Sequence, residues 1–389
     1  MRFAVPMTAR DPAQVDRAAT PLELFFDLTF VAAVAQCSTA FHHGLVDGDA
    51  GHALAVFPLI FWAIWWPWMN FTWFASAYDT DDAAYRVAVL IQMAGVLILA
   101  AGIPRMFDDL YRVVGVTGYV VMRVGLASLW LRAARADVER RSVCRRYAVG
   151  VLLCQAAWVA LAALPLHWWI PFAVVVGAAE VAVPWWAERD HPTSWHPGHI
   201  GERYGLFTII VLGESVLATT VAVQVALDAG SRFADLLTVA VGGFLIVATM
   251  WWIYFDLPVE EVLARARRAH TALDGRRAFA WGYGHYVVFA SVAATGAGLA
   301  AAVDQVTHHS ALTRLESAFA VTVPVAVYLL AVWALHASSK PPGPARTLLP
   351  PAAVLLVLAM SWTGEPVLLT GLVLMALAVA SLVAHHRQG

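Results

Sequence analysis

The stretch that decides the fold runs from residue 54 to residue 78 and reads LAVFPLIFWAIWWPWMNFTWFASAY. It contains no charged side chain, and it exceeds the roughly 20 apolar residues that a helix needs to cross a bilayer. Across all 389 residues, 60% are apolar and 13% are charged, against about 25% charged in soluble domains. This composition excludes soluble enzymes, nucleic-acid binders and disordered proteins, and it predicts an integral membrane protein.

Similar apolar segments, bounded by charges, proline or glycine, recur along the chain. They predict an all-α protein with about twelve transmembrane helices, near 22–42, 54–78, 86–104, 113–133, 147–166, 168–187, 201–223, 235–257, 277–302, 315–337, 347–363 and 367–385. Only Leu164-Pro165-Leu166 separates the fifth segment from the sixth, so these two could also form one interrupted segment.

The basic residues indicate how these helices are oriented. If the N-terminus is cytoplasmic, 20 of the 25 Lys and Arg residues fall in cytoplasmic segments and four fall in outer loops. Short cytoplasmic loops are enriched in Lys and Arg, so this distribution favours twelve helices with both termini inside. The net charge of −2 suggests no nucleic-acid partner. The first 20 residues are polar and lack the apolar core of a signal peptide, so we expect a cytoplasmic tail at 1–20.

Two pairs of similar segments suggest an internal duplication. The residues from Glu23 to Val31 resemble those from Glu202 to Ile210, and Ala77-Tyr78-Asp79 resembles Tyr254-Phe255-Asp256 at nearly the same offset. We therefore expect two parallel six-helix halves, 21–187 and 201–389, joined by a cytoplasmic linker at 188–200. Chance similarity between apolar segments is the alternative.

Ionisable and polar side chains within or beside spans are functional candidates, because burying them in a bilayer is costly. Glu23 and Asp27 are four residues apart and therefore share one helix face. The acids of both halves gather toward the predicted cytoplasmic side. The candidates for a ligand or ion pathway outside the midplane are Glu23, Asp27, Asn70, Asp79, Glu202, Asp256 and His285.

Two charges, Arg123 and Glu214, fall near the predicted midplane. Each is costly alone, so the simplest expectation is that they pair with each other. Such a pair has two interpretations, a structural lock between the halves or a gate or proton-coupled site. Glu180 has no counterpart in the second half and is expected to face the bundle without a functional role.

The string Asp79-Thr80-Asp81-Asp82 has three interpretations. Clustered aspartates can hold Mg²⁺ and, through it, a phosphate or diphosphate. The same sequence pattern, Asp-x-Asp-Asp, matches the acid motif of class II terpene cyclases, in which an aspartate donates a proton. The third interpretation is a solvated acidic turn that caps the next helix.

Aromatic and histidine-rich segments offer weaker signals. The segment 54–78 holds Trp62, Trp65, Trp66, Trp68 and Trp73, which either pack between helices or form a cation–π wall around a cationic ligand. The outer loop at 41–52 holds three His and two Asp without a fixed ligand spacing, so it predicts a metal site only weakly. The three cysteines match no metal or disulfide pattern.

These motifs together resemble a known family. The strings Pro21-Leu-Glu-Leu-Phe-Phe-Asp-Leu-Thr-Phe-Val31, Gln92-Met-Ala-Gly-Val and Leu212-Gly-Glu-Ser215, with Trp251-Trp-Ile-Tyr-Phe-Asp256, are similar to those of the bacterial low temperature requirement protein A family. The resemblance covers about residues 20–300. It implies a multi-pass protein of the bacterial inner membrane, named for a cold-growth phenotype, and it supplies neither an activity nor catalytic residues.

Three functional hypotheses follow from the residues. The first is a carrier for a small polar solute or ion, in which the acids named above line a path and Arg123 and His285 supply a counter-charge and a proton partner. The second is an intramembrane enzyme acting on an isoprenoid or other lipid-borne substrate through Asp79, Asp81 and Asp82, with Mg²⁺ as a cofactor. The third is a non-catalytic membrane sensor or scaffold.

Overall fold

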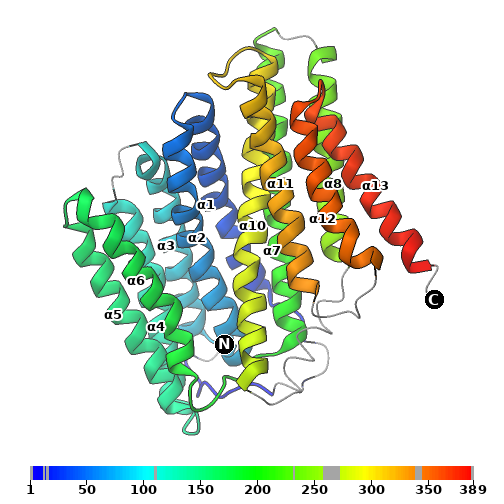
Figure 1. Cartoon of the computed structure of the whole chain (residues 1–389). Helices are drawn as coiled ribbons and strands as arrows, with labels where there is room; N and C mark the ends of the chain where they lie inside the picture. The colour runs from blue at the N-terminus through cyan, green and yellow to red at the C-terminus, as the bar shows by residue number, and fades with distance from the viewer. Residues whose placement is uncertain are drawn as a thin grey trace. The chain divides into compact units, whose positions relative to one another are not determined.

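The computed structural model of the chain describes residues 3–11, 14, 17–108, 112–230, 233–256, 272–337 and 344–386. Within these residues the regular structure is helical and there is no strand. The helices are α1 (Pro21–Val46), α2 (Ala50–Tyr78), α3 (Ala83–Asp108), α4 (Val113–Ala136), α5 (Arg141–Ala162), α6 (Leu166–Ala187), α7 (Pro197–Asp228), α8 (Phe233–Phe255), α10 (Ala272–Val306), α11 (Arg314–Ala337), α12 (Pro344–Ala359), the 3₁₀ turn η1 (Met360–Trp362) and α13 (Pro366–His386) (Figure 1).

Each predicted segment contains a helix, and α5 and α6 are separate helices because the chain breaks at residues 163–165. Among the described residues, nine helices are long and apolar enough to cross a membrane. The other three are α5, whose first two turns hold Arg141, Arg145 and Arg146, and α6 and α12, whose apolar stretches Pro171–Ala187 and Leu348–Trp362 are shorter. The all-α membrane class is confirmed, whereas the count of twelve spans stays a prediction.

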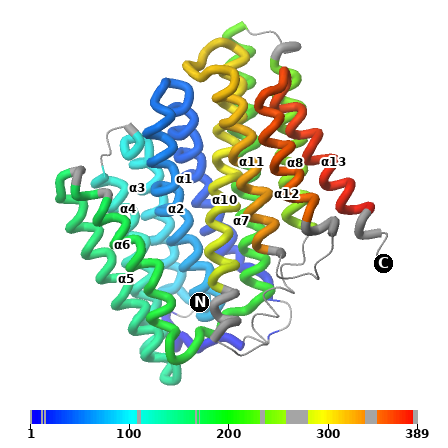
Figure 2. The backbone as a smooth tube through the Cα atoms, in the orientation of Figure 1, coloured from blue at the N-terminus to red at the C-terminus, as the bar shows by residue number. Residues whose placement is uncertain are grey.

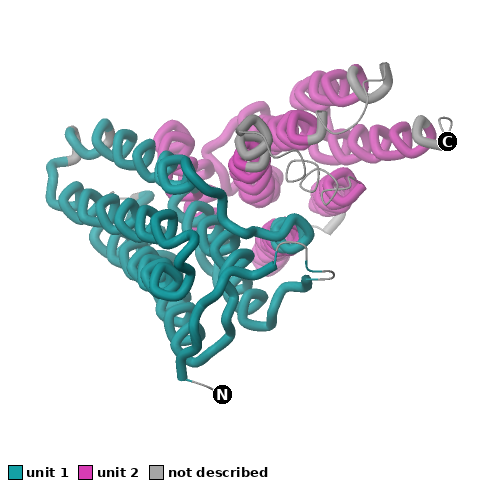
Figure 3. Tube along the Cα trace, turned by 90° about the horizontal axis from the view of Figure 1, so that it is seen from below, with its two compact units in different colours: residues 1–36, 62–204 teal, residues 37–61, 205–389 magenta. Residues whose placement is uncertain are grey.

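The chain divides into two compact units (Figure 3). Unit 1 comprises residues 1–36 and 62–204, and unit 2 comprises residues 37–61 and 205–389. The boundaries fall inside α1, α2 and α7, so each of these helices has residues in both units. The predicted halves, 21–187 and 201–389, rest on similar sequence motifs, whereas the two units are defined by compactness. The units therefore do not test the duplication, which stays a prediction.

Small residues let neighbouring helices of each unit pack closely. In unit 1, α3 to α6 lie side by side in chain order (Figure 2). A Cβ atom on Gly95 would lie 2.7 Å from the carbonyl oxygen of Gly118, so α3 and α4 approach backbone to backbone. In unit 2, a Cβ on Gly242 of α8 would lie 2.6 Å from the Leu368 Cα of α13. Close packing of this kind holds helices together in lipid, where apolar burial gives little driving force.

Large apolar side chains remain exposed along the helices. Leu153, Val175 and Phe244 are each more than 60% exposed. An apolar exterior of this extent is unfavourable in water and fits contact with the hydrocarbon of a bilayer.

Candidate functional site

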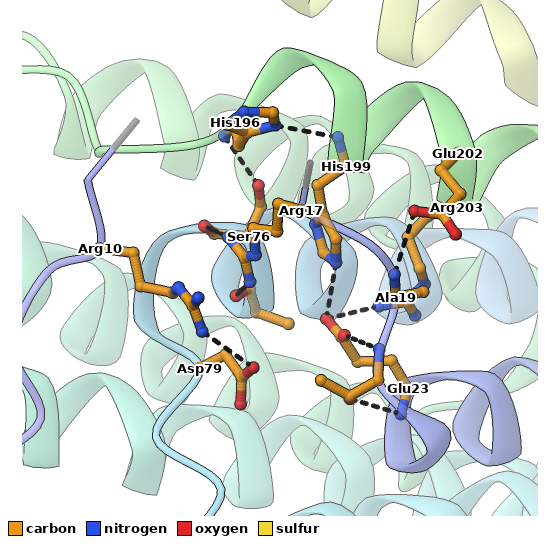
Figure 4. Close-up of polar contacts among 12 residues, drawn as sticks. Arg10, Arg17, Ala19, Glu23, Ser76, Asp79, His196, His199, Glu202 and Arg203 are labelled. Carbon is orange, nitrogen blue, oxygen red and sulfur yellow. Dashed lines mark hydrogen bonds and ion pairs between the residues drawn. The ribbon is translucent and has the colours of Figure 1, made fainter. Parts of the chain in front are cut away.

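The candidate site begins at the first turn of α1, in unit 1 (Figure 4). Thr20 and Glu23 form a capping box, in which the Thr20 backbone N–H donates to Glu23 Oε2 at 2.8 Å and the Glu23 N–H donates to Thr20 Oγ1 at 3.3 Å. Pro21 lies at the first helical position, where its missing N–H costs no intrahelical bond. Capping occupies only one carboxylate oxygen, so Glu23 Oε1 is available for contacts inside the unit.

Arg203 of α7 binds both acids of α1. Its Nε and Nη2 donate to Asp27 Oδ2 and Oδ1 at 2.7 and 2.5 Å, and its Nη1 donates to Glu23 Oε1 at 3.1 Å. The two acids are each 1% exposed and the arginine is 0% exposed. The planar guanidinium matches a carboxylate with two parallel bonds, and the four-residue spacing of the acids lets one arginine reach both.

Trp68 and His199 complete the contacts of the two acids. Trp68 Nε1 of α2 donates to Asp27 Oδ1 at 2.7 Å, and His199 Nε2 of α7 lies 3.0 Å from Glu23 Oε1. Both side chains are fully buried. We call Glu23, Asp27, His199 and Arg203 the charge cluster. Pairing of this kind offsets the cost of removing charges from water, and removal of one partner typically costs about 3–5 kcal/mol.

The non-helical N-terminal segment, described at residues 3–11, 14 and 17–20, packs against unit 1, and we call it the N-terminal strap. Arg17 donates to the carbonyl oxygens of Ala75, at 2.7 Å, and Ser76, and the Arg10 backbone N–H donates to that of Ala77 at 2.9 Å. These carbonyls belong to the last turn of α2, where no helical N–H reaches them. The segment expected as a tail therefore caps α2 beside the charge cluster.

Asp79 lies just after α2 and contacts the strap through Arg10 Nη1 at 3.4 Å. Its side chain is 5% exposed. Burial and the charge of Glu23 raise the pKa of Asp79 to about 6, although the charges of Arg17 and Arg10 act in the opposite direction. This carboxyl can therefore exchange a proton close to physiological pH.

The other two aspartates of the acidic turn bind different arginines. Asp81 pairs with Arg86 at 2.7 Å and its side chain is 51% exposed. Asp82 pairs with Arg132 and caps α3 by accepting from the Tyr85 backbone N–H at 2.9 Å. The three carboxylates are thus bound separately, and among the described residues no group of three or more His, Cys, Asp or Glu side chains is placed to hold a metal ion. The observed turn matches the capping interpretation for Asp82.

Arg123 of α4 pairs with Glu180 of α6, its Nε lying 2.9 Å from Glu180 Oε1. The prediction of a pair between Arg123 and Glu214 is therefore wrong. Glu180 Oε2 accepts from Tyr119 OH at 2.9 Å and from Trp158 Nε1 at 3.0 Å, so both carboxylate oxygens have partners. Arg123 Nη2 donates to Asn70 Oδ1 at 3.4 Å, so the predicted pathway residue Asn70 belongs to this second network and not to the charge cluster.

Most tryptophans of α2 are packing residues. The Trp62 ring lies 6.2 Å from that of Tyr119 and 6.3 Å from that of Trp158, which favours packing between helices over a wall around a free cation. Trp68 is different, because its N–H holds Asp27.

Three of the predicted pathway residues, Glu214, Asp256 and His285, lie in unit 2. Glu214 is 5% exposed in the middle of α7. His285 of α10 is fully buried, with Nδ1 2.8 Å from the Trp281 carbonyl oxygen and Nε2 3.0 Å from Tyr254 OH. Asp256, by contrast, is exposed after the end of α8, unlike its proposed counterpart Asp79. His42, in the second-last turn of α1, pairs with Asp304 at 2.7 Å.

The structure brings together Glu23 and Asp79, with Glu202 accepting from the nearby Ala19 N–H at 3.0 Å (Figure 4). Asp27 joins Glu23 through their shared partner Arg203. Sequence reasoning missed Arg203, His199, Arg17 and the role of Glu180. Arg203 follows Glu202 directly in the segment 202–210, which resembles residues 23–31. Its position beside the start of an apolar segment was the available signal. His199 and Arg17 lie outside the predicted spans and gave no such signal.

The apolar helices and the buried charge cluster define a multi-span helical membrane protein. The profile of the bacterial low temperature requirement A protein family matches residues 18–385, so the chain belongs to this family. The chain is also 26% identical to an uncharacterized protein of Rhizobium meliloti (strain 1021), over 93% of this chain and 88% of that protein.

Proposed function

We propose that this protein is a carrier that moves a small polar solute or ion across the cytoplasmic membrane of a bacterium. The observation that supports the proposal is the charge cluster. Two acids, an arginine and a histidine are buried within α1 and α7, both of which are apolar enough to cross a membrane. Ionisable groups in membrane helices are costly and mark substrate, ion or proton paths.

The contacts suggest how such a site would work. Arg203 engages Asp27 through two parallel bonds, and this arrangement needs an ionised carboxylate. When Asp27 takes up a proton, the ion pair weakens and the guanidinium becomes available to a solute carrying an anionic or carbonyl oxygen. His199, with Nε2 3.0 Å from Glu23 Oε1, provides a second group that can bind and release a proton.

The two rival hypotheses predict other arrangements. An isoprenoid enzyme using Asp79, Asp81 and Asp82 requires carboxylates that converge on a metal or a substrate, whereas each of the three binds a different arginine. A sensor or scaffold requires the charge cluster to be purely structural, and the experiment below separates that reading from transport.

The experiment compares two buried ion pairs of unit 1 in a strain lacking the gene. One strain carries Asp27→Asn with Arg203→Gln, and the matched control carries Arg123→Gln with Glu180→Gln. Each double variant removes both charges of one ion pair. In the first variant Glu23 also loses Arg203 and keeps His199 and the Thr20 N–H as partners. Polar metabolites of cells and medium are profiled at equal membrane levels of protein.

We expect the Asp27/Arg203 variant to match the deletion strain and the Arg123/Glu180 variant to match the wild type. A wild-type profile for the Asp27/Arg203 variant would remove the charge cluster from the transport site.

We also infer twelve spans with both termini in the cytoplasm. The support is the bias of basic residues toward alternate loops, together with the nine apolar helices among the described residues.

A further inference from the structure

Glu214 lies in the middle of α7, in the part of this helix that belongs to unit 2. It is the only charged residue between Arg203 and Asp228. At about 1.5 Å of rise per residue, it lies roughly 20 Å or more from either end of the helix. A side chain at this depth is beyond the reach of the headgroups.

One oxygen of the Glu214 carboxylate has no hydrogen-bond partner in the part of the chain that the structure describes. The residue is 5% exposed, and its Oε2 has no hydrogen-bond partner among the described residues. The contrast with Glu180 is direct, since that buried carboxylate has donors on both oxygens.

Two described helices, α10 and α8, contact this part of α7, and neither has an Asp, Glu, Lys or Arg residue at the same level. Ser215 Oγ donates to the Val292 carbonyl oxygen at 3.0 Å and packs on Gly296 of α10. The nearest His, Asp, Glu, Lys or Arg residues of α10 on either side of this contact are His285 and Asp304, roughly 16 and 12 Å along the axis from Gly296. His285 binds Tyr254 and Trp281, and Asp304 binds His42. The α8 sequence has no charge between Asp235 and Asp256.

The faces of α7 show where Glu214 points. Gly213, Val216 and Leu217 are exposed, whereas Glu214 and Ser215 are buried. Glu214 therefore lies on the covered side of the helix, next to its exposed stripe. An unpaired carboxylate in apolar surroundings is far costlier than a neutral carboxylic acid, so it neutralises by binding a proton.

We propose that Glu214 is a proton-binding carboxyl, and that uptake and release of this proton drive the carrier. The first half of this statement stands on the geometry of α7 alone. The second half rests on the proposed transport function, and it names the proton as the coupling ion.

The test uses dicyclohexylcarbodiimide, an apolar reagent that modifies carboxyl groups which are protonated in an apolar environment. The purified full-length protein in lipid nanodiscs is treated at about pH 6 and about pH 9, and modified peptides are identified by mass spectrometry. We expect modification of Glu214 that falls by roughly tenfold or more at the higher pH, as the proton is lost. Glu180 and Glu23 serve as internal controls that stay unmodified, because each is held by donors.

A second arm places Glu214→Gln in the deletion strain, where we expect the metabolite profile of the deletion. Unmodified Glu214 at about pH 6 overturns proton binding and leaves the charge cluster untouched. Modified Glu214 with a wild-type profile for Glu214→Gln overturns coupling alone. If the Asp27/Arg203 variant behaves as wild type, transport fails, and the labelling still decides whether Glu214 binds a proton.

Discussion

Two buried arginines of unit 1 are neutralised in different ways. Arg123 faces a single carboxylate, Glu180, whose Oε2 accepts from two neutral donors, Tyr119 OH and Trp158 Nε1. Arg203 faces two carboxylates and shares one of them with a histidine. When Asp27 takes up a proton, Arg203 loses the ion pair with Asp27 and keeps Glu23, 3.1 Å from its Nη1, as a counter-charge. This difference is why we assign function to the charge cluster and structure to Arg123.

Protonation of Asp79 makes the free energy of unfolding depend on pH. Its pKa in the folded protein is about 6, above the ordinary value of 3.8, so the folded state binds more protons than the unfolded state between these values. The free energy of unfolding should therefore fall as pH rises from about 4 to about 6, by at most about 3 kcal/mol. Thermal unfolding in detergent, followed by tryptophan fluorescence, measures this. Asp79→Asn should lack the decline and be the more stable protein at neutral pH, and equal pH profiles would contradict the assignment.

The acids of the charge cluster could be predicted from the sequence, and their partners could not. Glu23 and Asp27 are conspicuous because charges are rare in apolar helices and their spacing places them on one face. Arg203 lies six residues after the start of α7, and a basic residue near the end of a span is ordinary. Its bond to Asp27 depends on how α7 packs on α1 within unit 1, which no local pattern encodes. For the same reason Glu180, and not Glu214, is the partner of Arg123.

Helices were predicted well because hydropathy and length decide them. Every predicted segment corresponds to a helix, with ends that differ by a few residues, and the Pro165 break separates α5 from α6. The N-terminal strap was not predicted, because a polar segment near a terminus has the composition of a free tail. Its contacts, made by Arg17 and Arg10 with the last carbonyl oxygens of α2, depend on the folded structure.

The helices α5 and α6 decide the number of spans. If both cross the membrane, the loop at Val138 is cytoplasmic and the loop at Ala163 is on the other side. In a protein whose three cysteines are replaced, Val138→Cys should react with an impermeant maleimide only in inverted vesicles. Ala163→Cys should react only in intact spheroplasts. Labelling of both positions from the same side would show that α5 does not span, and the count of twelve would be wrong.

At the scale of the whole molecule, α1, α2 and α7 connect the two units because each has residues in both. The charge cluster lies in unit 1 and Glu214 lies in unit 2, yet Arg203 and Glu214 share α7. Compact units that divide single helices could not be predicted from the sequence, since the repeated motifs favoured halves divided at residues 188–200. The similar motifs that end at Asp79 and Asp256 also differ in their surroundings, because Asp79 is buried and Asp256 is exposed.

Transport itself is tested most directly with purified protein in liposomes. The vesicles are loaded with a ¹³C-labelled polar metabolite extract of the host bacterium, a pH gradient is imposed, and ¹³C solutes outside are measured by mass spectrometry. The account predicts that at least one solute crosses with the wild-type protein and not with empty liposomes or the Asp27→Asn/Arg203→Gln variant. If no solute or ion crosses under either direction of the gradient, or if the variant passes the same solutes at the same rate, the account is contradicted.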